Sequence, residues 1–237
     1  MLRAIIVLVV FLIFEIVMLP ILLILKIVKI KNKKFTKNVL YRLVKVFTNI
    51  MLKISGVKLN IDKRNLESNE TYLFVSNHQS IFDILFIIKA IDIPIAFIAK
   101  KELVYLPVLR LWMKELGCIF IDRKNIKNSI NEINNAVDKL KNNNSLVIFP
   151  EGTRSVDGNI GKFKPGSFKL AINSEAAVVP ITINNAYKIL KKGSFKINRG
   201  EASIKIGSPV CFIDYGEDNS VEISEKIREE IQKNIIF

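Results

Sequence analysis

Hydrophobic residues dominate the start of the chain, where residues 4–28 form a nearly unbroken apolar run. At about 1.5 Å per residue, a helix over this range is long enough to cross the roughly 30 Å hydrocarbon core of a bilayer. Glu15 and Pro20 interrupt the run. A carboxyl group is costly inside a bilayer, and a proline bends a helix. We therefore expect a membrane helix that either spans the bilayer or is bent and re-entrant. A cleaved signal peptide is the alternative, but no small-x-small cleavage site precedes Lys26.

Positive charge gathers at the end of this run, in five closely spaced lysines: Lys26, Lys29, Lys31, Lys33 and Lys34. Positively charged flanks of a membrane helix stay on the cytoplasmic side. We therefore expect the rest of the chain to lie at the cell membrane, on its cytoplasmic side.

Residues 36–54 show a different pattern, in which apolar residues recur every three or four positions and basic residues lie between them. This periodicity predicts an amphipathic helix. It is typical of a helix at a membrane interface, and a helix packed on a protein core has the same pattern. We assign residues 1–55 to membrane-anchoring and interfacial helices, and residues 56–237 to a second domain.

After Gly56, short apolar runs alternate with amphipathic stretches. This alternation predicts an α/β domain with a largely parallel sheet flanked by helices. Strands are expected at residues 57–61, 72–76, 95–99, 118–121, 145–149, 177–183 and 202–206. Helices are expected at residues 81–90, 107–116, 126–141, 168–173 and 221–235.

Composition narrows the choice of partners. The chain has 36 Lys and Arg against 22 Asp and Glu, a formal net charge of +14, which predicts attraction to polyanions. The apolar start favours an anionic bilayer over nucleic acid, and no finger, aromatic RNA-binding motif or arginine-glycine tract occurs in the sequence. Cys118 and Cys211 are far apart, and His78 is the single histidine, so we expect neither a disulfide framework nor a metal site.

The first candidate for chemistry is the stretch YLFVSNHQSIFD at residues 72–83, where a predicted strand gives way to a predicted helix. Ligands bind at the carboxyl ends of strands in such sheets. An aspartate such as Asp83 that holds one imidazole nitrogen leaves the other nitrogen of His78 basic, as a general base acting on an alcohol requires. Alternatively, Ser80 is the N-cap of the helix and Asp83 only stabilises its first turn.

The second candidate is FPEGTRS at residues 149–155, which follows another predicted strand and precedes the basic stretch KFKPG at residues 162–166. The planar guanidinium of Arg154 suits bidentate binding of phosphate, and Glu151 could orient that group or a ligand hydroxyl. An ordinary turn with a solvated arginine has the same composition.

Two further features follow the same order along the chain. GCIFIDR at residues 117–123 ends in Arg123, which is either a second phosphate ligand or half of a surface ion pair. Pro180 interrupts an apolar run, so it marks a sheet edge, a strand start or a pocket wall.

Together these four blocks, over roughly residues 72–183, resemble the family of glycerolipid acyltransferases that includes 1-acylglycerol-3-phosphate acyltransferase. The family motif of a histidine, four residues and an aspartate corresponds to His78 and Asp83. The resemblance implies that His78 is the general base and Asp83 its orienting partner. It also implies that the glycerol phosphate is bound by residues of the other blocks, namely Arg123, Glu151, Gly152, Thr153 and Arg154, with Lys100 and Lys101 as further candidates.

The implied reaction moves a fatty acyl group from a thioester of coenzyme A or acyl-carrier protein to the 2-hydroxyl of lysophosphatidic acid, which forms phosphatidic acid without a further cofactor. Three alternatives remain at this point, one of which is a soluble-domain hydrolase that would release free fatty acid instead of forming phosphatidic acid. An acyltransferase of the same fold could use glycerol 3-phosphate or another lysophospholipid, and a non-catalytic module could bind anionic membrane lipid through its basic surface.

Overall fold

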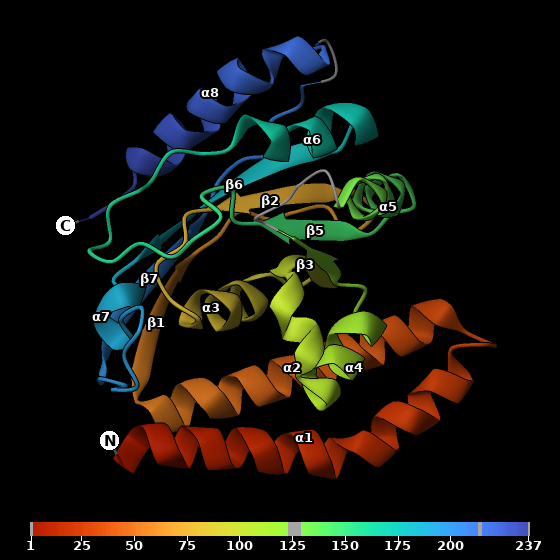
Figure 1. Cartoon of the computed structure of the whole chain (residues 1–237), viewed down its shortest axis with the longest axis vertical. Helices are drawn as coiled ribbons and strands as arrows, with labels where there is room; N and C mark the ends of the chain where they lie inside the picture. The colour runs from red at the N-terminus through yellow and green to blue at the C-terminus, as the bar shows by residue number, and fades with distance from the viewer. Residues whose placement is uncertain (1, 123–128, 213–214, 237) are drawn as a thin grey trace.

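A computed structural model of the chain describes residues 2–122, 129–212 and 215–236. Two long helices come first, α1 (Leu2–Val28) and α2 (Lys33–Ser55), and they run antiparallel along one side of the molecule (Figure 1). In the described part of the chain, α1 is the one helix long and apolar enough to cross a membrane.

Helix α1 is continuous through Pro20 but changes direction in its C-terminal half (Figure 1). Glu15 is buried on the side that packs against the protein, so its carboxyl group is not on the outward face. That outward face is formed by exposed apolar side chains, among them Ile5, Leu12 and Ile16. The two interruptions seen in the sequence are therefore accommodated by a bend and by inward orientation.

Helix α2 lies between α1 and the rest of the molecule. Its Tyr41 hydroxyl donates a hydrogen bond of 3.2 Å to the carbonyl oxygen of Ile91, and Leu52 is buried in the main core. Phe35 and Ile50 of the same helix are exposed. One face of α2 is thus packed on the domain, as one of the two interpretations of its periodicity expected.

The described residues after α2 form a sheet of seven strands, all within two residues of the predicted bounds. The strands are β1 (Val57–Asp62), β2 (Tyr72–Ser76), β3 (Ile95–Lys100), β4 (Ile119–Ile121), β5 (Ser145–Ile148), β6 (Ala177–Asn184) and β7 (Gly200–Ile206). Their order in the sheet is β1-β7-β6-β2-β5-β3-β4.

Five of the six strand pairings are parallel, which confirms the predicted fold class. The exception is β6 with β7, which are antiparallel. Pro180 lies inside β6, one residue before the ladder with β7 begins at Ile181. Pro180 is therefore within the strand and not at its start, and its missing N–H group lies just before the pairing with β7 begins.

Helices cover both faces of the sheet (Figure 1). The remaining helices are α3 (Phe82–Ala90), α4 (Pro107–Glu115), α5 (Ile130–Lys141), α6 (Lys169–Ser174), the short α7 (Ala186–Ile189) and α8 (Ser220–Gln232), with 3-10 turns at Lys101–Tyr105, Pro165–Ser167 and Glu217–Asn219. Helices α3, α4 and α2 lie on one side, α5, α6 and α8 on the other, and α1 is outermost. The central strands β2 and β5 are buried along their whole length, so the ends of these strands are firmly positioned.

Candidate active site

His78 follows the carboxyl end of β2 and precedes α3, at the centre of the sheet. Its Nδ1 atom lies 2.7 Å from Oδ2 of Asp83, which is fully buried. The same oxygen accepts hydrogen bonds from the backbone N–H groups of Gln79 at 2.7 Å and Ser80 at 2.9 Å. Asp83 therefore orients the imidazole and stabilises the start of α3 at once, so the two interpretations of this segment are compatible.

The predicted N-cap is wrong in one detail. Helix α3 starts at Phe82, and the Ser80 side chain does not cap it. Instead, the Ser80 hydroxyl donates a hydrogen bond of 2.8 Å to the carbonyl oxygen of Leu190. Asp83, from the first turn of the helix, accepts the backbone N–H of Ser80, which is the half of a capping box that the acidic residue supplies.

The His78 ring is held on its second side by an aromatic contact. It stacks on Phe149, with ring centroids 4.0 Å apart and 19° between the planes. Because the carboxylate of Asp83 can only accept, Nδ1 carries the hydrogen, and in the neutral ring the lone pair is then on Nε2. Within the described ranges Nε2 has no hydrogen-bond partner, so it is the nitrogen available to a substrate hydroxyl.

The residues on either side of His78 fix its backbone through long-range hydrogen bonds. The side-chain amide of Asn77 exchanges two bonds with the backbone of Ile183 in β6, at 2.9 and 2.8 Å. The amide of Gln79 donates to the carbonyl of Gly158 at 3.1 Å and accepts from the N–H of Ala186 at 3.0 Å. Two separate parts of the chain are thereby tied to the histidine segment.

Glu151 comes from the block after β5, the strand next to β2. Its carboxylate accepts from the backbone N–H of His78 at 2.8 Å and from that of Gly161 at 3.0 Å. Burial is the largest influence on Glu151 and raises its pKa to about 7, while these two hydrogen bonds oppose the rise. The structure therefore places Glu151 as a link between two loops, with both oxygens directed at protein backbone.

Gly152 adopts a left-handed conformation, with φ of 72°. A Cβ atom there would lie 3.1 Å from the Nζ atom of Lys164. Conformation and close approach both favour glycine at this position, because a side chain would strain the turn and displace the lysine. Gly152 thus lets the basic stretch at residues 162–166 pass over the 149–155 block.

Arg154 is half-buried and forms no hydrogen bond or ion pair with any other residue that the structure describes. Its neighbour Ser155 donates its N–H to the carbonyl oxygen of His78 at 2.7 Å, which keeps Arg154 close to the histidine. Thr153 accepts a 2.8 Å hydrogen bond from Nζ of Lys192. Arg154, Lys164 and Lys192 together supply positive charge around this block.

Lys100 is the last residue of β3 and Lys101 follows it, at the same edge of the sheet as His78. Strand β3 is two places from β2, which corresponds to roughly 10 Å between strand axes. Lys100 forms an ion pair of 2.9 Å with Glu102, and Lys101 is exposed. The structure therefore places these lysines farther from His78 than the 149–155 block. Arg123 lies outside the described residues.

Three contributors to the site were not assigned roles from the sequence: Phe149, Gln79 and Lys192. Their contacts join positions that are 39 to 107 residues apart in the chain, so no local pattern indicates them. Phe149 lies inside a block that the sequence had singled out, but its contact with the His78 ring was not expected.

Within the described ranges, no group of three or more His, Cys, Asp or Glu side chains gathers where a metal could be held.

Known proteins that are similar to this chain are acyltransferases. The profile of the family described as Acyltransferase matches residues 58–184. A probable 1-acyl-sn-glycerol-3-phosphate acyltransferase of Mycoplasma pneumoniae is 32% identical over 206 residues, which cover 82% of this chain and 76% of that protein. The 1-acyl-sn-glycerol-3-phosphate acyltransferase of Saccharomyces cerevisiae is 29% identical over 83% of this chain and 63% of its own length.

A solved structure shares the fold. The crystal structure of the 1-acyl-sn-glycerophosphate (LPA) acyltransferase PlsC from Thermotoga maritima superposes with a TM-score of 0.71 and 23% sequence identity. The match covers 97% of this chain and 98% of that one. It therefore includes α1 and α2 as well as the sheet.

Proposed function

This chain belongs to the acyltransferase family, and from that premise we propose that it transfers a fatty acyl group from a thioester to the 2-hydroxyl of lysophosphatidic acid, forming phosphatidic acid. The observation that carries the proposal is the bond between Nδ1 of His78 and Asp83, which leaves Nε2 without a partner in the described part of the chain. The names of the relatives from Mycoplasma and yeast support the same acceptor.

In this mechanism Nε2 of His78 takes the proton of the acceptor hydroxyl as that oxygen attacks the thioester carbonyl carbon. The resulting tetrahedral species collapses and breaks the carbon–sulfur bond. The sulfur leaves and takes the proton back from the imidazolium, so the histidine returns to its starting state. Asp83 keeps the tautomer fixed and stabilises the positive ring between the two steps.

The acceptor phosphate is bound by the cations around the 149–155 block. Arg154 has both the planar fork that matches phosphate oxygens and no competing partner among the described residues. Holding the phosphate there keeps the hydroxyl close to His78, and such positioning can supply several kcal/mol of the barrier. Lys164 and Lys192 add charge, and Arg123, Lys100 and Lys101 remain candidates for longer-range contacts.

The proposal includes where the reaction takes place. In this proposal the exposed apolar face of α1 associates with a membrane and the sheet lies on the cytoplasmic side, which the lysines after α1 support. The acyl donor is a thioester of coenzyme A or acyl-carrier protein, and no other cofactor takes part. No nucleic acid is a partner, because the positive charge serves anionic lipid.

The test compares membranes that contain the wild-type chain with membranes that contain His78→Ala at equal expression, supplied with labelled lysophosphatidic acid and an acyl thioester. We expect phosphatidic acid from the wild type and a loss of at least about a hundredfold in the variant, the low end of a general-base contribution. Because His78 is the single histidine, modification of the wild type with a histidine-selective reagent should give the same loss.

Each other outcome has a definite meaning. Equal product from both proteins removes His78 from catalysis and favours the lipid-binding module. No product with lysophosphatidic acid but product with glycerol 3-phosphate or another lysophospholipid keeps the chemistry and changes the acceptor.

A further inference from the structure

Residues 190–199, here called the basic loop, connect α7 to β7. The loop carries four positive charges and no acidic residue: Lys191, Lys192, Lys196 and Arg199. At its tip, Phe195 is 84% exposed, the highest value for any large hydrophobic side chain that the structure describes. A phenylalanine held in water between lysines contributes nothing to the core, so this arrangement calls for another explanation.

The basic loop is fastened at three points. Its Leu190 carbonyl accepts the hydroxyl of Ser80, beside the catalytic histidine, at 2.8 Å, and Lys192 donates to Thr153 at 2.8 Å. Its Ile197 carbonyl accepts a hydrogen bond from Arg3, in the first turn of α1, at 3.3 Å. The loop therefore joins the start of α1 to both halves of the proposed active site.

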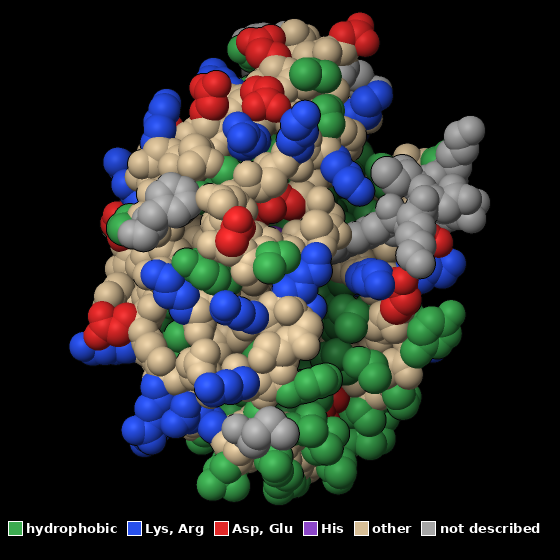
Figure 2. Space-filling model, turned by 60° about the vertical axis from the view of Figure 1, so that its left-hand side comes forward, with side chains coloured by type: hydrophobic (Ala, Val, Ile, Leu, Met, Phe, Trp, Pro, Cys, Tyr) green, Lys and Arg blue, Asp and Glu red, His purple; other side chains and the backbone are tan. Residues whose placement is uncertain are grey.

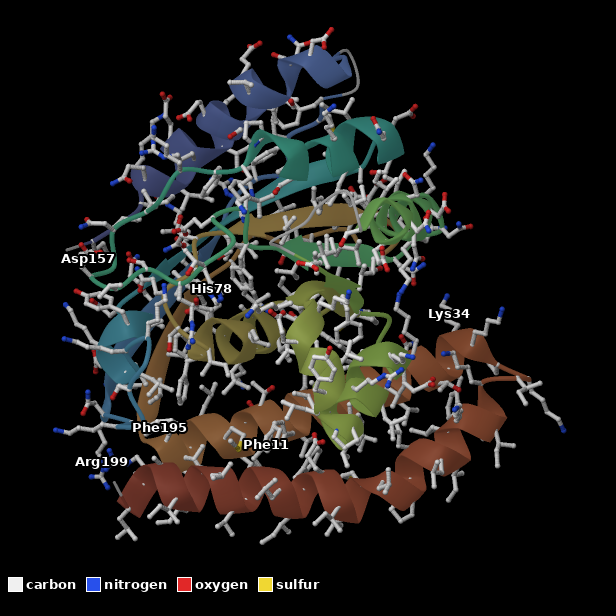
Figure 3. All side chains as sticks on the ribbon, viewed as in Figure 1. Phe11, Lys34, His78, Asp157, Phe195 and Arg199 are labelled. Carbon is white, nitrogen blue, oxygen red and sulfur yellow. The ribbon has the colours of Figure 1, made fainter. Side chains whose placement is uncertain are left out.

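The first turns of α1 continue this surface with apolar side chains, since Leu2, Ile5, Ile6 and Val9 are all exposed. Phe195 and Arg199 lie near the start of α1, on the left-hand side of the view in Figure 3; His78 lies above them on the same side, and Lys34 lies on the opposite side. Figure 2 shows Lys and Arg side chains on this face, above exposed hydrophobic side chains at its lower end. Exposed apolar and basic groups thus meet along one border.

We propose that the basic loop is a second membrane-contact site, in which Phe195 enters the headgroup region while Lys191, Lys196 and Arg199 bind anionic lipid headgroups. Aromatic side chains favour the interface, and basic groups are attracted to anionic lipid. The charged groups of these three residues have no ion pair with the rest of the described chain, so none has to be released first. The contact brings the mouth of the His78 site against the leaflet, where an anionic acceptor lies; this consequence rests on the proposed function.

An acidic carrier protein could also be attracted to these lysines. The lipid surface is favoured because Phe195 is exposed beside the apolar start of α1, so one membrane can contact Phe195 and the apolar side chains of α1 at the same time. A carrier protein accounts for the charge but not for that continuity.

The first experiment measures insertion directly and does not depend on activity. The full chain carrying Phe195→Trp is reconstituted in vesicles with 30% phosphatidylglycerol and with brominated lipids that quench tryptophan near the headgroups. Val221→Trp, on α8 at the opposite side of the molecule, is the matched control, because Val221 is also an exposed apolar residue. Trp112 is present in both proteins, so its signal cancels in the comparison.

We expect quenching of the added tryptophan in Phe195→Trp and none in Val221→Trp. Equal fluorescence with and without brominated lipid in both variants would overturn the proposal, whatever the enzyme activity turns out to be.

The second experiment tests the charges with the double variant Lys191→Gln/Lys196→Gln. Its matched control is Lys141→Gln/Lys226→Gln, which removes the same charge from α5 and from α8. Activity is measured with lysophosphatidic acid in vesicles, with and without phosphatidylglycerol, and with a short-chain soluble acceptor. Each lysine at an anionic surface is worth roughly a fivefold change in binding.

We expect the loop variant to lose about fivefold to twentyfold of its activity on anionic vesicles and to keep its activity on the soluble acceptor. The control variant should keep its activity on both the anionic vesicles and the soluble acceptor. The lipid assignment would be overturned in favour of the carrier protein if the loop variant lost activity only with acyl-carrier protein as the donor, and lost it on the soluble acceptor as well as on vesicles. If the wild type forms no phosphatidic acid at all, the proposed function fails while the quenching result still decides the loop.

Discussion

The histidine segment and the phosphate-binding block of the proposed site lie side by side but are held in opposite ways. His78 is fixed by a carboxylate, an aromatic ring and the bonds of its neighbours. Arg154, one residue from the backbone contact with His78, has no partner among the described residues. The group that must transfer a proton is oriented in advance, whereas the group that must bind substrate is left uncommitted.

This difference has a physical reason. A general base acts only within hydrogen-bond reach of the proton and in the right tautomer, so the protein has to fix its geometry before substrate arrives. A cation that already holds a protein carboxylate would have to break that ion pair to bind phosphate. Substitutions on the two sides should therefore have different effects. In the histidine segment they should lower the reaction rate and the stability of the fold, and in the phosphate-binding block they should weaken substrate binding.

The largest effect in this comparison should come from Asp83→Asn. The amide keeps the shape of the side chain but cannot stabilise imidazolium, and it offers a donor where the His78 ring now donates. We expect the rate to fall by about a hundredfold to ten thousandfold, as loss of an orienting aspartate does elsewhere. The melting temperature should also fall, because the buried carboxylate accepts two backbone N–H groups.

Asp157→Asn is the matched control, since Asp157 also accepts local hydrogen bonds in a loop but is exposed. Rate assays and thermal melts on both variants make the test. An unchanged rate for Asp83→Asn would show that the pair is structural only.

The sequence predicts much of the fold and the His78–Asp83 pair, because apolar runs and a strand-to-helix junction are strong local patterns. All seven strands were predicted from apolar runs, and His78 and Asp83 were paired by their position at a strand-to-helix junction. The antiparallel β6 and β7 pairing and the four-residue α7 were not, since α7 is too short for periodicity and the residues between the strands carry no hairpin signal. Contacts such as that of Gln79 with Ala186 depend on the finished fold, which no local pattern encodes.

On the binding side, Arg154→Ala should raise the KM for the acceptor while changing kcat less. A hydrogen bond to a charged group is worth about 1.5 to 3 kcal/mol, so the rise should be roughly tenfold to a hundredfold. The KM of Arg154→Lys should lie between those of the wild type and Arg154→Ala, because a positive charge remains but the planar guanidinium is lost. Stability should change little, since Arg154 bonds to nothing in the described part of the chain.

Kinetics with varied acceptor concentration separate these terms, and Arg64→Ala, an exposed arginine before β2, is the control. A loss confined to kcat would place Arg154 with the reacting groups instead, and the division between the two sides of the site would not hold.

The smallest effect, and the one that joins the two sides, concerns Glu151, which belongs to the phosphate-binding block but bonds to the backbone of His78. Burial raises its pKa from 4.5 to about 7, so the folded protein binds this proton more tightly than the unfolded chain does. Stability from this group is then fully present below about pH 4.5, declines as pH rises toward 7 and is constant above. Glu151→Gln, which resembles the protonated form, should lack this decline.

Melting temperatures of the two proteins between about pH 5 and pH 8 should therefore shift in favour of Glu151→Gln as pH rises, by a few degrees, since about 1 kcal/mol corresponds to roughly 2 to 4 °C at this chain length. Activity at pH 8 should move the other way, because the amide has one acceptor oxygen for two backbone N–H groups and the His78 segment is held less firmly. Glu70→Gln, an exposed acid outside the site, supplies the baseline. A temperature difference that stays constant across this range would mean that Glu151 does not titrate there, and that its role is the same link between the loops at every pH.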